Sequence, residues 1–80
     1  MERKEIRERV VEVIGRVLGL DEEVIVDDAS LVEDLGADQL DFYVMVKELE
    51  DEFAISVTDE QAEKISTVGQ AITCVTEMVG

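Results

Sequence analysis

Apolar residues recur at helical spacing in three separate stretches of this 80-residue chain, and this periodicity restricts the fold more than any other feature. The stretches are residues 5–18, 39–53 and 68–79. No part of the chain shows the sustained alternation that a sheet would need. The periodicity therefore predicts an all-α fold, a small antiparallel four-helix bundle with three long helices, one short helix and a long loop between the first two. We expect residues 1–80 to form a single domain.

Three capping boxes are predicted at the starts of helical segments. Ser30 stands three residues before Glu33, which predicts a single helical turn within the long connection 20–37. Thr58 and Thr67 each stand three residues before a glutamine. We expect a short helix from Thr58 to about Ile65 and the last long helix after Thr67.

The core must be built mainly from aliphatic side chains, because the chain has only two Phe, one Tyr and no Trp. Phe42 and Tyr43 are expected to pack, since an aromatic residue at helical spacing is more often part of a core than a contact residue. The face of helix 39–53 that we expect to be buried carries Leu40, Met45, Val46, Leu49 and Phe53. The residues expected to hold the long loop on the core are Leu20, Val24, Ile25, Leu31, Val32 and Leu35.

The net charge of −14 is concentrated in the middle of the chain, where residues 21–63 hold sixteen acids and only Lys47 as a base. A field of one sign argues against nucleic acid as a partner and favours basic protein surfaces. A solvated face kept acidic for solubility would give the same composition, and only its position around helix 39–53 favours docking.

Other functional classes find little support in the sequence. With no histidine and no evident pairing of a nucleophile with a base, we do not expect an enzyme. The acids lack the order of a metal-binding loop. No apolar run is long enough to span a membrane and no signal peptide is evident, so we expect a cytoplasmic protein. We also expect a monomer. The lone Cys74 falls among apolar positions, where core packing is favoured over a redox role.

Residues 33–41 read EDLGADQLD and join the long loop to helix 39–53. Gly36 permits an unusual backbone angle, Asp38 can cap the helix, and Asp41 suits its first turn. The segment resembles the attachment motif of acyl carrier proteins, in which the residue at position 39 is a serine esterified with 4'-phosphopantetheine. Further resemblance lies in a first helix that ends near Gly19 and Leu20 and in residues 29–32, 49–53 and 59–65, so that it covers nearly the whole chain.

The resemblance implies a four-helix bundle that holds an acyl chain between its helices and presents an acidic second helix to enzymes of fatty-acid or related acyl-chain biosynthesis. The partners implied are basic surfaces of synthases or transferases. The residues expected to dock are Asp38, Asp41, Val44, Lys47, Glu48 and Asp51. Val44 and Lys47 depart from the family, which usually has a glutamate and an apolar residue there, so the set of partners is expected to differ.

Gln39 is the main departure from the family. A carboxamide has no hydroxyl to accept the cofactor, so no cofactor is expected at this position. The glutamine is either a designed substitution or the residue of a natural relative that has given up carriage; attachment at another serine is disfavoured by the lack of motif context. Two functions therefore remain, a carrier-type protein in an unmodifiable form and a regulatory or scaffold binding module that kept the carrier fold.

Overall fold

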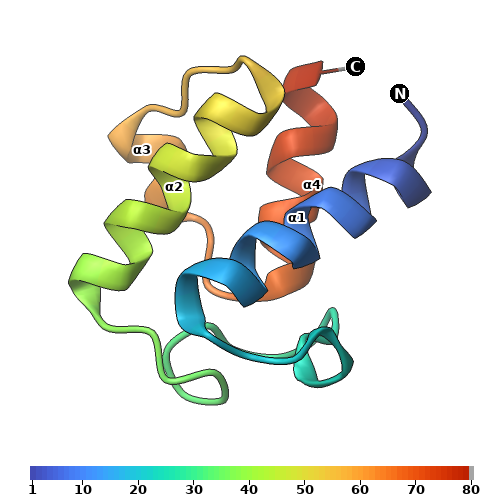
Figure 1. Cartoon of the computed structure of the whole chain (residues 1–80). Coiled ribbons are helices and arrows are strands. Elements are labelled where there is room, and N and C mark those ends of the chain that lie inside the picture. The colour runs from blue at the N-terminus through green and yellow to red at the C-terminus, as the bar shows by residue number, and fades with distance from the viewer. Residues whose placement is uncertain (80) are drawn as a thin grey trace.

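A computed structural model describes residues 1–79 and contains four α-helices and one short 3₁₀ helix (Figure 1). The elements are α1 (Arg3–Leu18), η1 (Glu22–Val24), α2 (Gln39–Phe53), α3 (Asp59–Glu63) and α4 (Val68–Val79). Within residues 1–79 no strand is formed, and a single isolated bridge pairs Ser30 with Thr67. The prediction of an all-α fold is confirmed.

Helix α1 packs against both α2 and α4, and in Figure 1 it crosses in front of α4. It begins at Arg3, two residues before the predicted start, and it ends where predicted, because Gly19 adopts the left-handed conformation at φ 68°. That conformation suits glycine, which has no Cβ to clash. The start of α1 also reaches the last helix, since the Arg3 guanidinium donates to the Thr76 hydroxyl at 3.4 Å.

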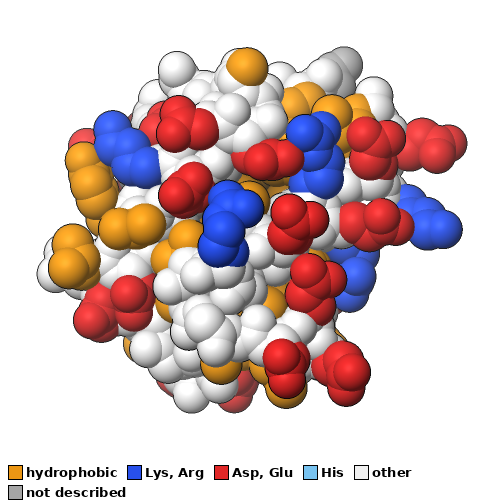
Figure 2. Space-filling model, in the orientation of Figure 1, with side chains coloured by type: hydrophobic (Ala, Val, Ile, Leu, Met, Phe, Trp, Pro, Cys, Tyr) orange, Lys and Arg blue, Asp and Glu red, His pale blue; other side chains and the backbone are white. Residues whose placement is uncertain are grey.

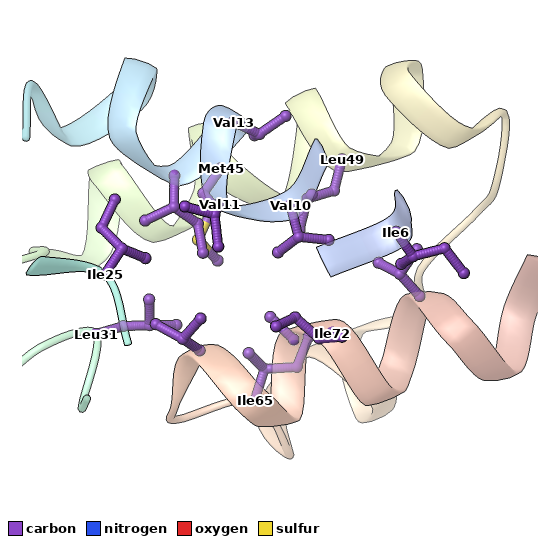
Figure 3. Packing of buried hydrophobic residues seen from close by; sticks show 14 of the residues in the cluster. Ile6, Val10, Val11, Val13, Ile25, Leu31, Met45, Leu49, Ile65 and Ile72 are labelled. Carbon is purple, nitrogen blue, oxygen red and sulfur yellow. The ribbon is translucent and has the colours of Figure 1, made fainter. Parts of the chain in front are cut away.

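The core is a single, mainly aliphatic cluster between these three helices and the long loop (Figure 3). Figure 3 shows α1 and α2 side chains facing Ile65, Ile72 and the loop residues Ile25 and Leu31. The buried residues of α1 are Ile6, Val10, Val11, Val13, Ile14 and Gly15. Those of α2 are Met45, Leu49 and Phe53, and those of α4 are Val68, Ala71, Ile72 and Val75. A Leu-, Ile- and Val-rich core of this kind supplies most of the driving force for folding.

Backbone hydrogen bonds attach the long loop to the junction between α3 and α4. The Leu31 amide donates to the Ser66 carbonyl at 2.9 Å, and the Gly69 amide donates to the Asp27 carbonyl at 2.7 Å. Gly69 allows this approach, because a Cβ at that position would lie 3.0 Å from the same carbonyl oxygen. The loop that leads to α2 is therefore held both by its buried Ile25 and Leu31 side chains and by backbone hydrogen bonds.

Two of the predicted capping boxes form as expected and one is closed by a different residue. Thr58 and Thr67 each exchange hydrogen bonds with the glutamine three residues later. At Ser30 the hydroxyl accepts from the Glu33 amide at 3.1 Å, but the carboxylate that reaches back to the Ser30 amide belongs to Asp34. The predicted helical turn does follow Ser30, whereas α3 ends at Glu63, before the predicted Ile65.

Four apolar residues expected to be buried are exposed instead. Leu40 is 69% exposed and Tyr43 is 59% exposed, so their assignment to the core was wrong. Leu40 precedes the buried Leu49 by nine residues, which at 3.6 residues per turn places the two on opposite sides of the helix, about 180° apart. In the loop, Ile25 and Leu31 point inward while their neighbours Val24 and Val32 are exposed. Phe42 is half-buried and packs against the core, as predicted.

Candidate functional site

The site predicted from the sequence is the junction where the long loop meets α2. Gly36 takes φ 75°, the left-handed angle expected for it. The Asp38 carboxylate accepts a hydrogen bond from the Asp41 amide at 2.7 Å, and the Asp41 carboxylate accepts one from the Asp38 amide at 3.2 Å. This reciprocal pair closes a capping box and fixes the first turn of α2. Gln39 is the first residue of the helix and is exposed.

Helix α2 has a buried side and an outward side, and the sequence-predicted residues lie on the outward side or its edges. By helical geometry Leu40, Val44, Lys47 and Asp51 share one outward stripe, since they are spaced by four, three and four residues. All four are exposed. The stripe thus combines two apolar side chains with one base and one acid.

The edge of α2 that faces α1 is tied to that helix by ion pairs. Arg16 lies 3.5 Å from the Glu48 carboxylate, and Arg9 lies 2.8 Å from that of Glu52. Arg9 also sits 5.3 Å from the centre of the Phe53 ring. Glu48, predicted as a docking residue, is therefore partly engaged inside the molecule. Such half-exposed pairs are weak in water, so Glu48 can still exchange partners.

The opposite edge of α2 faces α3 across a groove of about 420 Å³, which the sequence did not predict. Gln39 lines this groove together with Lys47, whose ammonium lies 5.5 Å from the centre of the Tyr43 ring. The remaining lining residues are Phe42, Tyr43, Val46, Glu50, Val57, Asp59, Ala62 and Glu63. The polar i, i+4 pattern of Gln39, Tyr43 and Lys47 is the signal that could have indicated an open edge on this side of α2.

Figure 2 shows the mixed character of the surface around these helices. Acidic side chains are spread over most of the face in view, and hydrophobic side chains gather at its left edge, where Figure 1 places the first turns of α2. The exposed apolar residues of this part of the chain include Val32, Leu40, Tyr43 and Val44. An apolar patch with acids around it is suited to contact with a protein surface.

The hydroxyls of two serines in the loops on either side of α2 and α3 form hydrogen bonds. The Ser30 hydroxyl is engaged by the Glu33 amide, and the Ser66 hydroxyl donates to the Gln70 side chain at 2.9 Å. Cys74 lies on α4, half-buried, and burial together with the Glu77 charge raises the pKa of its thiol. No group of three or more metal-ligating side chains comes together within residues 1–79. None of the helices in that range has the length and apolar character needed to cross a bilayer.

The structure is thus an all-helical domain whose second helix starts at a capped, exposed position in an acidic region. Residues 8–75 match the family described as the phosphopantetheine attachment site. A Mycobacterium tuberculosis protein described as an acyl carrier protein is 38% identical, with a TM-score of 0.85 over 90% of this chain and 96% of its own. Acyl carrier protein from Enterococcus faecalis is 35% identical, with a TM-score of 0.80 over 98% and 99% of the two chains.

The chain therefore belongs to the acyl carrier protein family. Members of this family are carriers rather than catalysts, and they bear phosphopantetheine and interact with acyl-chain enzymes. The residues of this chain do not fit the cofactor at the expected position, because the Gln39 carboxamide cannot form the phosphodiester that a serine hydroxyl forms. The fold of the family is present here, and residue 39, where the resemblance implies a serine, has no hydroxyl.

Proposed function

We propose that this protein is an acyl-carrier-type docking protein of fatty-acid or related acyl-chain biosynthesis that carries no phosphopantetheine at Gln39. The observation that supports it is the first turn of α2, where an exposed residue without a nucleophile stands in an otherwise complete motif. Within this proposal, the chain is one domain, an antiparallel four-helix bundle, and acts as a cytoplasmic monomer.

The proposed contact surface is the outward side of α2. Asp38, Asp41, Glu48 and Asp51 supply acidic groups for Arg and Lys residues of a synthase or transferase. Each exposed pair contributes little, and the summed charge of the acidic middle of the chain speeds encounter. Val44 and Lys47 lie in the same stripe and would select among partners, because Lys47 repels a basic group placed directly over it.

A competition experiment tests this function. A phosphopantetheinyl transferase, coenzyme A and a serine-bearing acyl carrier protein are mixed with increasing amounts of this chain, and the intact masses of both proteins are followed. We expect this chain to keep its mass and to slow modification of the other carrier, because it occupies the transferase without reacting. A gain in its own mass, or an absence of inhibition, would refute the proposal.

A matched pair of charge reversals identifies the surface. Asp51→Lys and Glu8→Lys change the net charge equally, and both residues are exposed, but Asp51 lies on α2 and Glu8 lies on α1. We expect Asp51→Lys to weaken inhibition several-fold and Glu8→Lys to leave it nearly unchanged. Equal effects of the two variants would mean that net charge alone governs binding and that α2 is not the contact surface.

The second candidate function is a regulatory or scaffold module that holds one partner for long periods. It is favoured by the exposure of Leu40 and Tyr43, which give α2 more apolar surface than a purely electrostatic dock needs. A salt titration of the same inhibition separates the two functions. A transient electrostatic dock weakens steeply as salt shortens the screening length, whereas a largely apolar contact does not.

A further inference from the structure

A separate hollow of about 670 Å³ lies between α3 and α4, away from the outward side of α2. Within residues 1–79 its lining comes from α4, from α3 and the residues that follow it, and from Arg3 at the start of α1. Among these described residues, none also lines the groove beside Gln39. The volume falls within the range of about 300–1,000 Å³ that is usual for small-molecule sites. The hollow is therefore large enough for a small ligand that has no connection with position 39.

Two glutamine side chains that line the hollow have only hydrogen-bond donors left to offer a ligand. The Gln61 carboxamide oxygen accepts from the Thr58 amide at 3.0 Å, and the Gln70 oxygen accepts from the Thr67 amide at 3.0 Å. The Gln70 oxygen also accepts from the amide and the hydroxyl of Ser66. Within residues 1–79 all side-chain hydrogen bonds of the two glutamines use the oxygen. The capping boxes thus hold both carboxamides in place and leave their NH₂ groups as donors.

The charged side chains of the lining carry a net positive charge, although the whole chain carries −14. The bases Arg3 and Lys64 outnumber the single acid, Glu77, which leaves one positive charge. Within residues 1–79 neither base forms an ion pair. The Arg3 guanidinium donates to the Thr76 and Thr73 hydroxyls at 3.4 and 3.5 Å, which uses only some of its N–H groups. The hollow also borders the first turn of α4, whose backbone amides add a partial positive charge.

Ile65, Cys74 and Met78 give the same hollow an apolar side. Ile65 is buried and the other two are half-buried, with the Cys74 sulfur 4.0 Å from the Met78 sulfur. Sulfur-containing side chains are polarizable and make favourable contacts with aromatic rings. The lining therefore combines an apolar surface with amide donors and an excess of one positive charge. A ligand that complements all three has one negative charge and an apolar body.

We propose that the hollow between α3 and α4 binds a small organic monocarboxylate, with its carboxylate held by the bases and glutamine amides and its apolar body against Ile65, Cys74 and Met78. The net charge of the chain opposes the approach of any anion. At physiological ionic strength this repulsion is screened over about 8 Å, whereas the contacts inside the hollow act at shorter range. The site uses neither α2 nor an attached group, so it is independent of the proposed docking function.

Titration of ¹⁵N-labelled protein with 3-phenylpropanoate, at constant physiological ionic strength, locates and measures the binding. Two matched ligands separate its parts, since 3-phenylpropanol keeps the apolar body without the charge and acetate keeps the charge without the apolar body. We expect 3-phenylpropanoate to shift the backbone amide signals of residues 64–78 along a saturating curve. It should bind several-fold more tightly than either matched ligand.

Charge changes inside and outside the hollow test whether its own side chains recognise the carboxylate. Lys64→Gln removes a base from the lining and should weaken binding several-fold, whereas Glu77→Gln removes its acid and should strengthen binding several-fold. Lys4→Gln and Glu8→Gln are the controls, because they change the net charge equally at exposed positions of α1 that do not line the hollow. We expect both controls to bind 3-phenylpropanoate nearly as the unchanged protein does.

Several results would overturn the inference. Non-saturating shifts, or shifts centred on the groove beside Gln39, would show that the ligand does not occupy this hollow. Equal affinity for 3-phenylpropanol or for acetate would show that the charge or the apolar body is not recognised. Equal effects of Lys64→Gln and Lys4→Gln would mean that net charge alone governs binding. These measurements involve no transferase, so failure of the docking function and failure of this inference are observed in different experiments.

Discussion

Replacing Asp38 separates its structural role at the start of α2 from its proposed role in docking. The Asp38→Ala variant loses the acceptor of the 2.7 Å hydrogen bond from the Asp41 amide and leaves that amide without its cap. Loss of an N-cap of this kind lowers the free energy of unfolding by about 1 kcal/mol. For a domain of this size, that loss lowers the melting temperature by about 4–8 °C. Asp38→Asn keeps an oxygen acceptor in the same place and should lose only a small part of this stability.

The comparison is clean because both variants change the net charge in the same way. The chain carries −14, so any relief of self-repulsion from removing one acid is common to both and cancels in their difference. Thermal unfolding followed by far-ultraviolet circular dichroism measures that difference. Equal melting temperatures for Asp38→Ala and Asp38→Asn would show that the capping box does not stabilise α2. Weaker transferase inhibition by Asp38→Asn, at unchanged stability, would assign the remaining role to the charge.

Two further predictions concern the sides of the molecule away from Gln39. Arg9→Ala removes the 2.8 Å ion pair with Glu52 and the contact with the Phe53 ring, and we expect urea unfolding to show a free energy of unfolding lower by about 1 kcal/mol. Arg9→Lys keeps the charge and should lower it less. An unchanged free energy of unfolding in both variants would contradict a stabilising role for these contacts. Burial raises the pKa of the Cys74 thiol, so at neutral pH its thiolate fraction is below that of an ordinary cysteine. Iodoacetamide should therefore react slowly with the folded chain and faster in urea, and equal rates would be inconsistent with a shielded thiol.

The boundaries of the second helix were predictable because several local signals agree there. Asp38 and Asp41 form a cap, and the apolar spacing of Met45, Leu49 and Phe53 continues without a break. The helix observed, Gln39–Phe53, has the predicted ends. Local capping chemistry and periodicity act over a few residues, so a sequence contains all the information they need.

The exposed stripe and the groove could be predicted only in part. Leu40 was assigned to the core on its apolar character, although its spacing from Leu49 places it outward. The groove depends on where α3 lies relative to α2, which is set by the loop and by the hydrogen bond from the Val57 amide to the Glu50 carboxylate at 2.8 Å. A side-chain hydrogen bond of this kind leaves no trace in the spacing of apolar residues, so an argument from periodicity does not detect it.

The structure around Gln39 shows that the start of α2 does not depend on the residue at position 39. Gln39 is exposed, and the buried residues of α2 are Met45, Leu49 and Phe53. The cap that starts the helix comes from Asp38 and Asp41, so the residue between them can change without loss of the helix. Attachment chemistry and folding are therefore independent at this site. Under the proposed function, residue 39 can therefore change without disturbing the helix that we propose as the contact surface for a partner.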